Sequence, residues 1–179
     1  MERTIGTIQI ETLVGDITDQ PDMDAVVNAA NAELRMGGGV AGAIHRKAGP
    51  GLAEETRPLA PIEPGQAVMT SGHDLPNDHV IHCLGPVYGR DEPADELLAA
   101  CFRNALRLAE QNGLASIAFP AISTGAFGYP TDDAAAVAVD AVVSMAEELS
   151  SIERVRFVLY SESDARTFEA ALRARTSGA

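Results

Sequence analysis

Residues 28–45 read NAANAELRMGGGVAGAIH, and this stretch decides how the rest of the chain is interpreted. It joins Asn28 and Asn31 to three consecutive glycines and then to a segment of helical composition. Glycine lacks a Cβ atom, so a ligand can reach the main-chain N–H groups of residues 37–39 without steric hindrance. If a helix follows, those groups lie at its positively polarised start, where anions bind. The stretch therefore predicts a loop that binds a phosphate group.

The segments on either side of this loop alternate between strand and helix patterns. Strands are predicted over 5–14, 23–27, 66–71, 79–84, 116–119 and 155–160. Helices are predicted over 40–48, between 49–51 and the proline-rich 58–64 loop, from Pro93 to Asn112, after Thr131 as N-cap, and after Ser163 as N-cap. Six strands interleaved with five helices predict an α/β fold of three layers, in which helices cover both faces of a mixed, mostly parallel six-stranded sheet.

The length and apolar content fit one domain of ordinary size. The chain has 179 residues, of which 46% are hydrophobic. We expect a single domain over 1–179, with a core from about 5 to 173 and a frayed tail at 176–179. Residues 1–10 lack an apolar run of signal-peptide length, and the longest apolar stretch, 134–143, contains Asp140. We therefore expect a cytoplasmic protein without a membrane partner.

The formal charge of −13 limits the classes of partner. Nucleic acids and anionic membranes attract proteins through clustered lysine and arginine side chains, and the net charge of this chain opposes that attraction. Nucleic acid is therefore not an expected partner, and any bound anion must be held by local groups. We expect a monomer.

The cysteines and histidines do not form a metal-binding pattern. Cys83 and Cys101 fall on a predicted strand and a predicted helix, where buried free thiols are expected and a disulfide or reactive thiol is the alternative. His79 and His82 lie three residues apart on a strand, so their side chains face opposite sides and are interpreted as structural. His45, close to the glycine loop, fits either local packing or a functional role.

Gly37, Gly39 and Gly42 match the GxGxxG pattern of nicotinamide dinucleotide sites. The context argues against that function, because nine residues separate the preceding predicted strand from Gly37. The acidic residue expected about 20 positions further on would be Glu63, which lies in a proline-rich loop. The pattern is therefore weak evidence here.

A second glycine loop, AISTGAFGYP over 121–130, follows the strand predicted at 116–119. By itself it fits an ordinary tight turn. In parallel sheets, however, ligands bind beyond the carboxyl ends of the strands, and Asp16, the 28–42 loop and the 123–128 loop all lie there. The two glycine loops can therefore clamp one diphosphate from opposite sides without lysine or arginine.

Four motifs resemble those of the macrodomain family, in the same order. They are GDIT at 15–18, NAAN with GGGV at 28–40, VIHCLGP at 80–86 and FPAISTGAFGYP at 119–130. The resemblance extends from about residue 8 to 171. It implies the three-layer α/β/α macrodomain fold and binding of ADP-ribose, either free or attached to protein. Many members also remove the group that is joined to the ADP-ribose. We expect no cofactor and no metal.

The resemblance also implies roles for individual residues. Asp16 would accept a hydrogen bond from the adenine amino group, with the Ile17 main chain beside it, and Tyr160 would stack on the adenine. Asn31 would bind the hydroxyl groups of the distal ribose, and Phe127 would pack on that ribose. The residues that would line the diphosphate are Gly38, Gly39, Val40, Ala41, Ser123, Thr124, Gly125, Ala126 and Phe127. The alternatives are a helix or turn cap for Asp16 and core packing for the aromatic side chains.

The expectation of catalytic activity depends on the residue that follows GGGV. The best-known hydrolase branch carries an aspartate after GGGV, where this chain has Ala41, and loss of a general base typically costs about 10²–10⁴ in rate. Other macrodomains share the GGGVA form, and some of these are regarded as hydrolases. Asn31 and His45 are then the candidate catalytic residues for ester hydrolysis at the distal ribose, assisted by a substrate phosphate. The alternatives are a non-catalytic reader of ADP-ribose and an ADP-ribose 1″-phosphate phosphatase.

Overall fold

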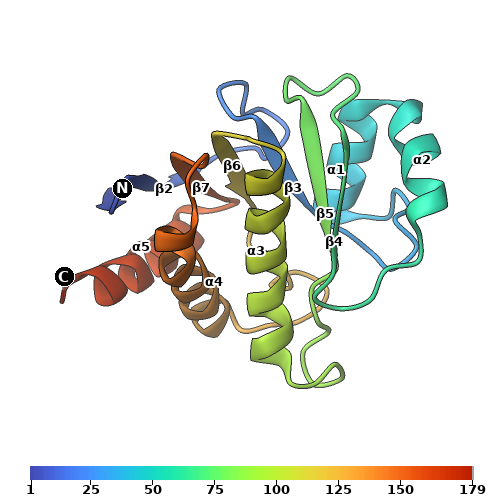
Figure 1. Ribbon diagram of the computed structural model, residues 1–179. Helices are drawn as coiled ribbons and strands as arrows, with labels where there is room; N and C mark the ends of the chain where they lie inside the picture. The colour runs from blue at the N-terminus through green and yellow to red at the C-terminus, as the bar shows by residue number, and fades with distance from the viewer. Residues whose placement is uncertain (179) are drawn as a thin grey trace.

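The computed structural model describes residues 1–178 as one twisted sheet with helices on both faces (Figure 1). The strands are β1 (Glu2–Ile5), β2 (Ile8–Val14), β3 (Ala25–Ala29), β4 (Ala67–Ser71), β5 (His79–Cys83), β6 (Ser116–Phe119) and β7 (Arg154–Leu159). The helices are α1 (Gly39–Ala48), α2 (Pro50–Thr56), α3 (Ala94–Gln111), α4 (Thr131–Met145) and α5 (Glu162–Thr176), with 3₁₀ turns η1 (Arg57–Leu59) and η2 (Ala146–Glu148). The predicted α/β class is confirmed.

The sheet is mixed and mostly parallel. Its strand order is β1-β2-β7-β6-β3-β5-β4, and only the two edge strands, β1 and β4, pair antiparallel with their neighbours. The predicted three layers are confirmed, because α1 and α2 cover one face while α3, α4 and α5 cover the other (Figure 1). The carboxyl ends of the parallel strands meet at one edge, as the placement of the candidate loops requires.

The strand count differs from the prediction. The predicted strand over 5–14 corresponds to β2, which begins at Ile8, whereas Ile5 ends a separate strand, β1, that lies mostly before the predicted range and pairs with β2 as a hairpin. Gly6 has a φ of 61°, which favours glycine in a two-residue hairpin turn. The sheet therefore has seven strands rather than six. β1 is almost wholly exposed and begins with Glu2 and Arg3, so it lacks the apolar alternation that indicated the other strands.

Two helix starts also differ from the prediction. Thr131 is the first residue of α4 rather than its N-cap, a position held by Pro130 without a side-chain hydrogen bond. Ser161, not Ser163, caps α5, because its hydroxyl accepts a hydrogen bond of 3.1 Å from Asp164 N–H. Thr176, placed in the predicted frayed tail of 176–179, ends α5, and residue 179 lies outside the described residues.

Alternating side chains of the central strands fill two apolar layers. Val27 of β3 belongs to the larger cluster beneath α3, α4 and α5, whereas its neighbour Val26 belongs to the cluster beneath α1. Four phenylalanines, Phe102, Phe119, Phe157 and Phe168, are the largest buried side chains. Cys83 and Cys101 are buried free thiols, as expected. Within residues 1–178, every helix is too short or too polar to cross a membrane.

Candidate functional site

The first glycine loop ends at a helix start that has unsatisfied N–H groups. Gly38 holds the N-cap position of α1 without a side-chain hydrogen bond, and the first backbone bond runs from Gly42 N–H to Gly38 O at 3.1 Å. Within residues 1–178, the N–H groups of Gly39, Val40 and Ala41 therefore have no acceptor. A Cβ added at Gly38 or Gly39 would meet no heavy atom within 4 Å. This helix start thus faces open space and can accept an anion.

Asn31 is tied to the same loop through both ends of its side-chain amide. Its Oδ1 accepts from Arg35 N–H and its Nδ2 donates to Arg35 O, each at 2.9 Å. A Cβ at Gly37 would lie 2.9 Å from Asn31 Nδ2, and Gly37 has a φ of 57°. Glycine is therefore required at position 37. The amide of Asn31 keeps one N–H for a ligand, since each side-chain amide carries two.

The second glycine loop uses its hydroxyl groups internally. Ser123 Oγ donates to Pro86 O and Thr124 Oγ1 donates to Ala121 O, both at 2.8 Å. Ser123 also has a φ of 68°, a conformation that costs energy for a residue other than glycine. In the described part of the chain, the N–H groups of 125–127 have no acceptor. This loop therefore offers backbone N–H groups rather than hydroxyl groups to a ligand.

The two glycine loops lie against each other. Phe127 packs on a small apolar cluster that includes Ala30 and Leu34, which flank Asn31 in the first loop. The end of β5 and the loop after it contact both, because Ala30 N–H of the first loop donates to Cys83 O at 2.9 Å and Tyr88 N–H donates to Phe127 O of the second at 2.8 Å. The carboxyl ends of β3, β5 and β6 are therefore brought to one surface, as the sequence predicts.

Asp16 and Tyr160 lie at the ends of the neighbouring strands β2 and β7. Gly15 N–H donates to Leu159 O at 3.0 Å, which holds the residues that precede them side by side. Asp16 Oδ1 accepts from the Thr18 hydroxyl at 2.7 Å and from Thr18 N–H at 2.8 Å, and these bonds lower the pKa of the carboxyl group. Asp16 therefore does cap a turn and stays ionised, which leaves Oδ2 for a ligand. Tyr160 is 94% exposed, so it does not pack in the core.

His45 and Ile17 are buried behind this surface. Ile17 packs in the apolar cluster beneath α1, so only its main chain can face a ligand. The ring of His45 is 2% exposed, and neither ring nitrogen has a hydrogen-bond partner among residues 1–178. Burial lowers the pKa of His45 and keeps the ring neutral. A role for His45 must therefore act through the loop in front of it.

Comparison with known proteins identifies the family. The Macro domain family model matches residues 27–138, which include both glycine loops. The chain belongs to the macrodomain family. The resemblance predicted from the four motifs is thereby confirmed.

Solved and named macrodomains cover nearly the whole chain. An Oceanobacillus iheyensis macrodomain with ADP is 38% identical with a TM-score of 0.94, covering 100% of this chain and 97% of that one. A Trypanosoma brucei macrodomain in complex with ADP-ribose is 38% identical with a TM-score of 0.85, covering 91% of this chain and 68% of that one. A Klebsiella pneumoniae protein named O-acetyl-ADP-ribose deacetylase is 45% identical, covering 90% of this chain and 94% of its own.

A buried polar chain supports the β3 end of this macrodomain site. Asn28 Nδ2 donates to His82 Nδ1 at 3.0 Å, so the other ring nitrogen carries the proton and donates to Thr70 Oγ1 at 3.0 Å. The Thr70 hydroxyl in turn donates a hydrogen bond to Ser71 O at 3.1 Å. Burial lowers the pKa of His82 to about 3. The histidine therefore has the structural role expected, as a neutral link between β3, β5 and β4.

The neutral state of His82 predicts a loss of stability in mild acid. Its pKa falls from 6.5 to about 3 on folding, so the unfolded chain takes up the proton first as the pH decreases. The stability that depends on the neutral His82 ring is therefore fully present above pH 6.5 and is lost as the pH decreases towards 3. From pH 7 to pH 5, His82 alone is expected to lower the free energy of unfolding by about 2 kcal/mol. Urea denaturation at the two pH values measures this difference in unfolding free energy. A smaller difference in His82→Gln than in the unmodified protein supports the assignment to His82, and the same difference in both proteins contradicts it.

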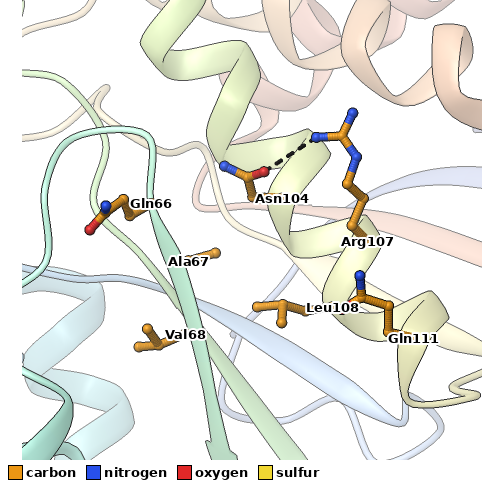
Figure 2. Close-up of a pocket in the computed structure, with 7 residues that line it drawn as sticks. All are labelled: Gln66, Ala67, Val68, Asn104, Arg107, Leu108 and Gln111. Atoms are coloured by element: carbon orange, nitrogen blue, oxygen red, sulfur yellow. Dashed lines mark hydrogen bonds between the residues drawn. The ribbon is translucent and has the colours of Figure 1, made fainter.

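Two hollows of the surface lie outside the glycine loops. One hollow of about 430 Å³ lies between the edge strand β4 and α3, and Figure 2 shows the side chains around it. Its lining residues are Gln66, Ala67, Val68, Asn104, Arg107, Leu108 and Gln111. A second, of about 220 Å³, lies between the end of β2 and α5. Neither is lined by a residue of the two glycine loops.

Proposed function

We propose that this macrodomain binds ADP-ribose across the carboxyl edge of its sheet and hydrolyses an ester at the distal ribose. The substrate class is mono-ADP-ribose on an acidic side chain, O-acetyl-ADP-ribose, or both. The observation that carries the proposal is the pair of adjacent loops whose N–H groups have no acceptor within residues 1–178. ADP and ADP-ribose in the solved relatives support the choice of ligand.

The diphosphate is assigned between the two glycine loops. The N–H groups of 39–41 supply the helix-start side, and the N–H groups of 125–127 supply the other side. Backbone donors suit a protein with a net charge of −13, because they bind an anion without a cationic patch. The Ser123 and Thr124 hydroxyls keep the second loop in shape instead of contacting phosphate.

The two ends of the ligand follow from this placement. The adenine lies at the ends of β2 and β7, where the ionised Asp16 accepts from the amino group and the exposed Tyr160 ring stacks on the base. The distal ribose lies at Asn31, with Phe127 packed against it. The Ile17 main chain borders the adenine.

Hydrolysis then depends more on how the substrate and the attacking water are positioned than on a general base from the protein. Asn31 holds the ribose hydroxyl groups so that the ester carbon faces a water that a ligand phosphate orients, and such positioning supplies a large share of many rate enhancements. Ala41 supplies no carboxylate, and the buried His45 contributes by supporting α1 behind the loop. Ala41 favours a second candidate function, a reader that binds ADP-ribose without turning it over.

Calorimetric titration with ADP-ribose tests the assignment of the adenine. Asp16→Ala is expected to weaken binding more than tenfold, or by more than about 1.4 kcal/mol, because the hydrogen bond to the amino group is lost. Asp19→Ala, an exposed aspartate of the same loop, is the matched control and should bind as the unmodified protein does. Equal affinities for Asp16→Ala and the unmodified protein would place the adenine elsewhere.

A further inference from the structure

The segment that carries Asp16 also serves as a cover for the sheet. On the face where α1 packs over β3, residues 15–24 lie over the neighbouring strands, with Ile17 and Met23 packed against Val26 and Val158. A loop in this position has no helical hydrogen bonds to hold its shape. Its backbone bonds near Asp16 are few: Gly15 N–H donates to Leu159 O and Asp19 N–H to Asp16 O, each at 3.0 Å. Side chains from the sheet and from a neighbouring loop therefore add to the support of Asp16.

Arg156 of β7 is the central group of that support. Its side chain is 8% exposed, and its Nε donates to Oε2 of Glu11, its register partner on β2, at 2.8 Å. Its Nη1 donates to Gln20 Oε1 at 2.9 Å, and its terminal nitrogens hold both Asp22 oxygens at 2.8 and 2.7 Å. These bonds lower the pKa of Asp22, whose carboxylate stays ionised. The planar guanidinium thus links two strands to the loop, a geometry that lysine cannot reproduce.

Gln20 connects Arg156 to Asp16. The residue is 5% exposed, and its Oε1 must face Arg156 because guanidinium groups only donate. Its Nε2 is then directed to Asp16 O, to which it donates at 2.9 Å. Asn77 Nδ2 donates to Gln20 O and to Met23 O, both at 2.7 Å, and so holds the backbone of the loop at these two residues. The orientation of one amide therefore couples the sheet to the main chain of Asp16.

We propose that Gln20 and Arg156 are positioning residues for purine recognition. Arg156 orients the Gln20 amide, and this amide holds the Asp16 main chain so that the carboxylate meets an exocyclic amino group. The inference rests on the proposed function. A carboxylate accepts a hydrogen bond from a 6-amino purine but opposes the oxygen of a 6-oxo purine. Loosening Asp16 therefore reduces the preference between these bases more than it reduces binding as such.

The chain offers a matched control in Arg154. This arginine also contacts Glu11, at 3.2 Å, and Asp22, at 3.0 Å, but it makes no hydrogen bond to Gln20 in the described residues. Arg154→Lys therefore perturbs the same carboxylates without breaking the connection to Asp16. Gln20→Met removes that connection at similar volume and adds no charge.

The experiment compares ADP-ribose with its hypoxanthine analogue, inosine diphosphate ribose, by calorimetry. The unmodified protein and Arg154→Lys are expected to prefer ADP-ribose about tenfold, as a hydrogen bond to a charged group implies. In Gln20→Met and Arg156→Lys this ratio is expected to fall below about threefold. Thermal unfolding of each variant shows whether it is folded at the temperature of titration, and the ratio itself does not respond to a general loss of stability.

The outcomes separate this inference from the proposed function. If Gln20→Met weakens both ligands equally, or leaves both unchanged, positioning is contradicted and the network serves only the fold. If Arg156→Lys does not fold, the result for Gln20→Met decides. Binding of both ligands by the unmodified protein without preference contradicts the inference while ADP-ribose binding stands. No binding of ADP-ribose contradicts the proposed function itself.

Discussion

Asn31→Ala is expected to slow hydrolysis of ester-linked mono-ADP-ribose about 100-fold, the typical cost of misplacing a substrate by about 1 Å. The side chain of Asn31 holds Arg35 through two hydrogen bonds and lies against Gly37, so its loss removes a ribose contact and loosens the loop. Release of ADP-ribose from a modified protein, in single turnover with excess enzyme, measures the effect separately from product release.

Arg35→Ala is the control for this variant. Asn31 contacts only the main chain of Arg35, so removal of the Arg35 side chain leaves both hydrogen bonds possible and is expected to leave turnover within about twofold, as for other exposed substitutions. Unchanged turnover in Asn31→Ala would contradict the role assigned to Asn31. Bound but intact substrate in the unmodified protein would instead support the reader function.

Gly125→Val is expected to weaken ADP-ribose binding about 100-fold or more while leaving the fold intact. A Cβ at Gly125 would meet no heavy atom of the protein within 4 Å, and Gly125 is not among the glycines with positive φ. The valine side chain therefore enters the space assigned to the diphosphate at little cost to folding. A 100-fold loss corresponds to about 2.8 kcal/mol in calorimetric titration.

Gly178→Val provides the comparison for this substitution. Gly178 follows α5 and is also open around its Cβ position, but it is not part of the proposed site. Both variants should unfold at nearly the same temperature as the unmodified protein, and only Gly125→Val should lose binding. Normal affinity in Gly125→Val would show that the diphosphate does not lie against this loop.

Local pattern was enough to predict the layers of the fold and the helix start after the glycines. Strand and helix periodicities, with glycine and proline between them, indicated an α/β protein, and parallel strands must end at a common edge. The pattern failed at the N-terminus, where the exposed strand β1 and the hairpin turn at Gly6 were not predicted. A turn of two residues leaves the alternation of the flanking side chains nearly unchanged.

The hydroxyl groups of the second loop illustrate a different limit. The sequence predicts Ser123 and Thr124 as ligand-binding residues, and both hydroxyls donate to main-chain oxygens of the protein instead. Whether a hydroxyl faces a ligand depends on a rotamer and on a carbonyl group from a distant segment, here Pro86 for Ser123. The N–H groups of 125–127 have no acceptor in the described residues and do not depend on side-chain rotamers, so the glycine pattern predicts backbone donors better than it predicts hydroxyl donors.

The sequence by itself determined the fold class and the positions of the two glycine loops, because short-range periodicity and glycine spacing act locally, and the resemblance of its four motifs indicated the family. Only the tertiary structure decided that His45 is buried behind its loop and that Gln20 lies between Arg156 and Asp16. Arg156 is 136 positions from Gln20 in the chain. Contacts of this kind arise from strand order and side-chain direction, which no local pattern contains.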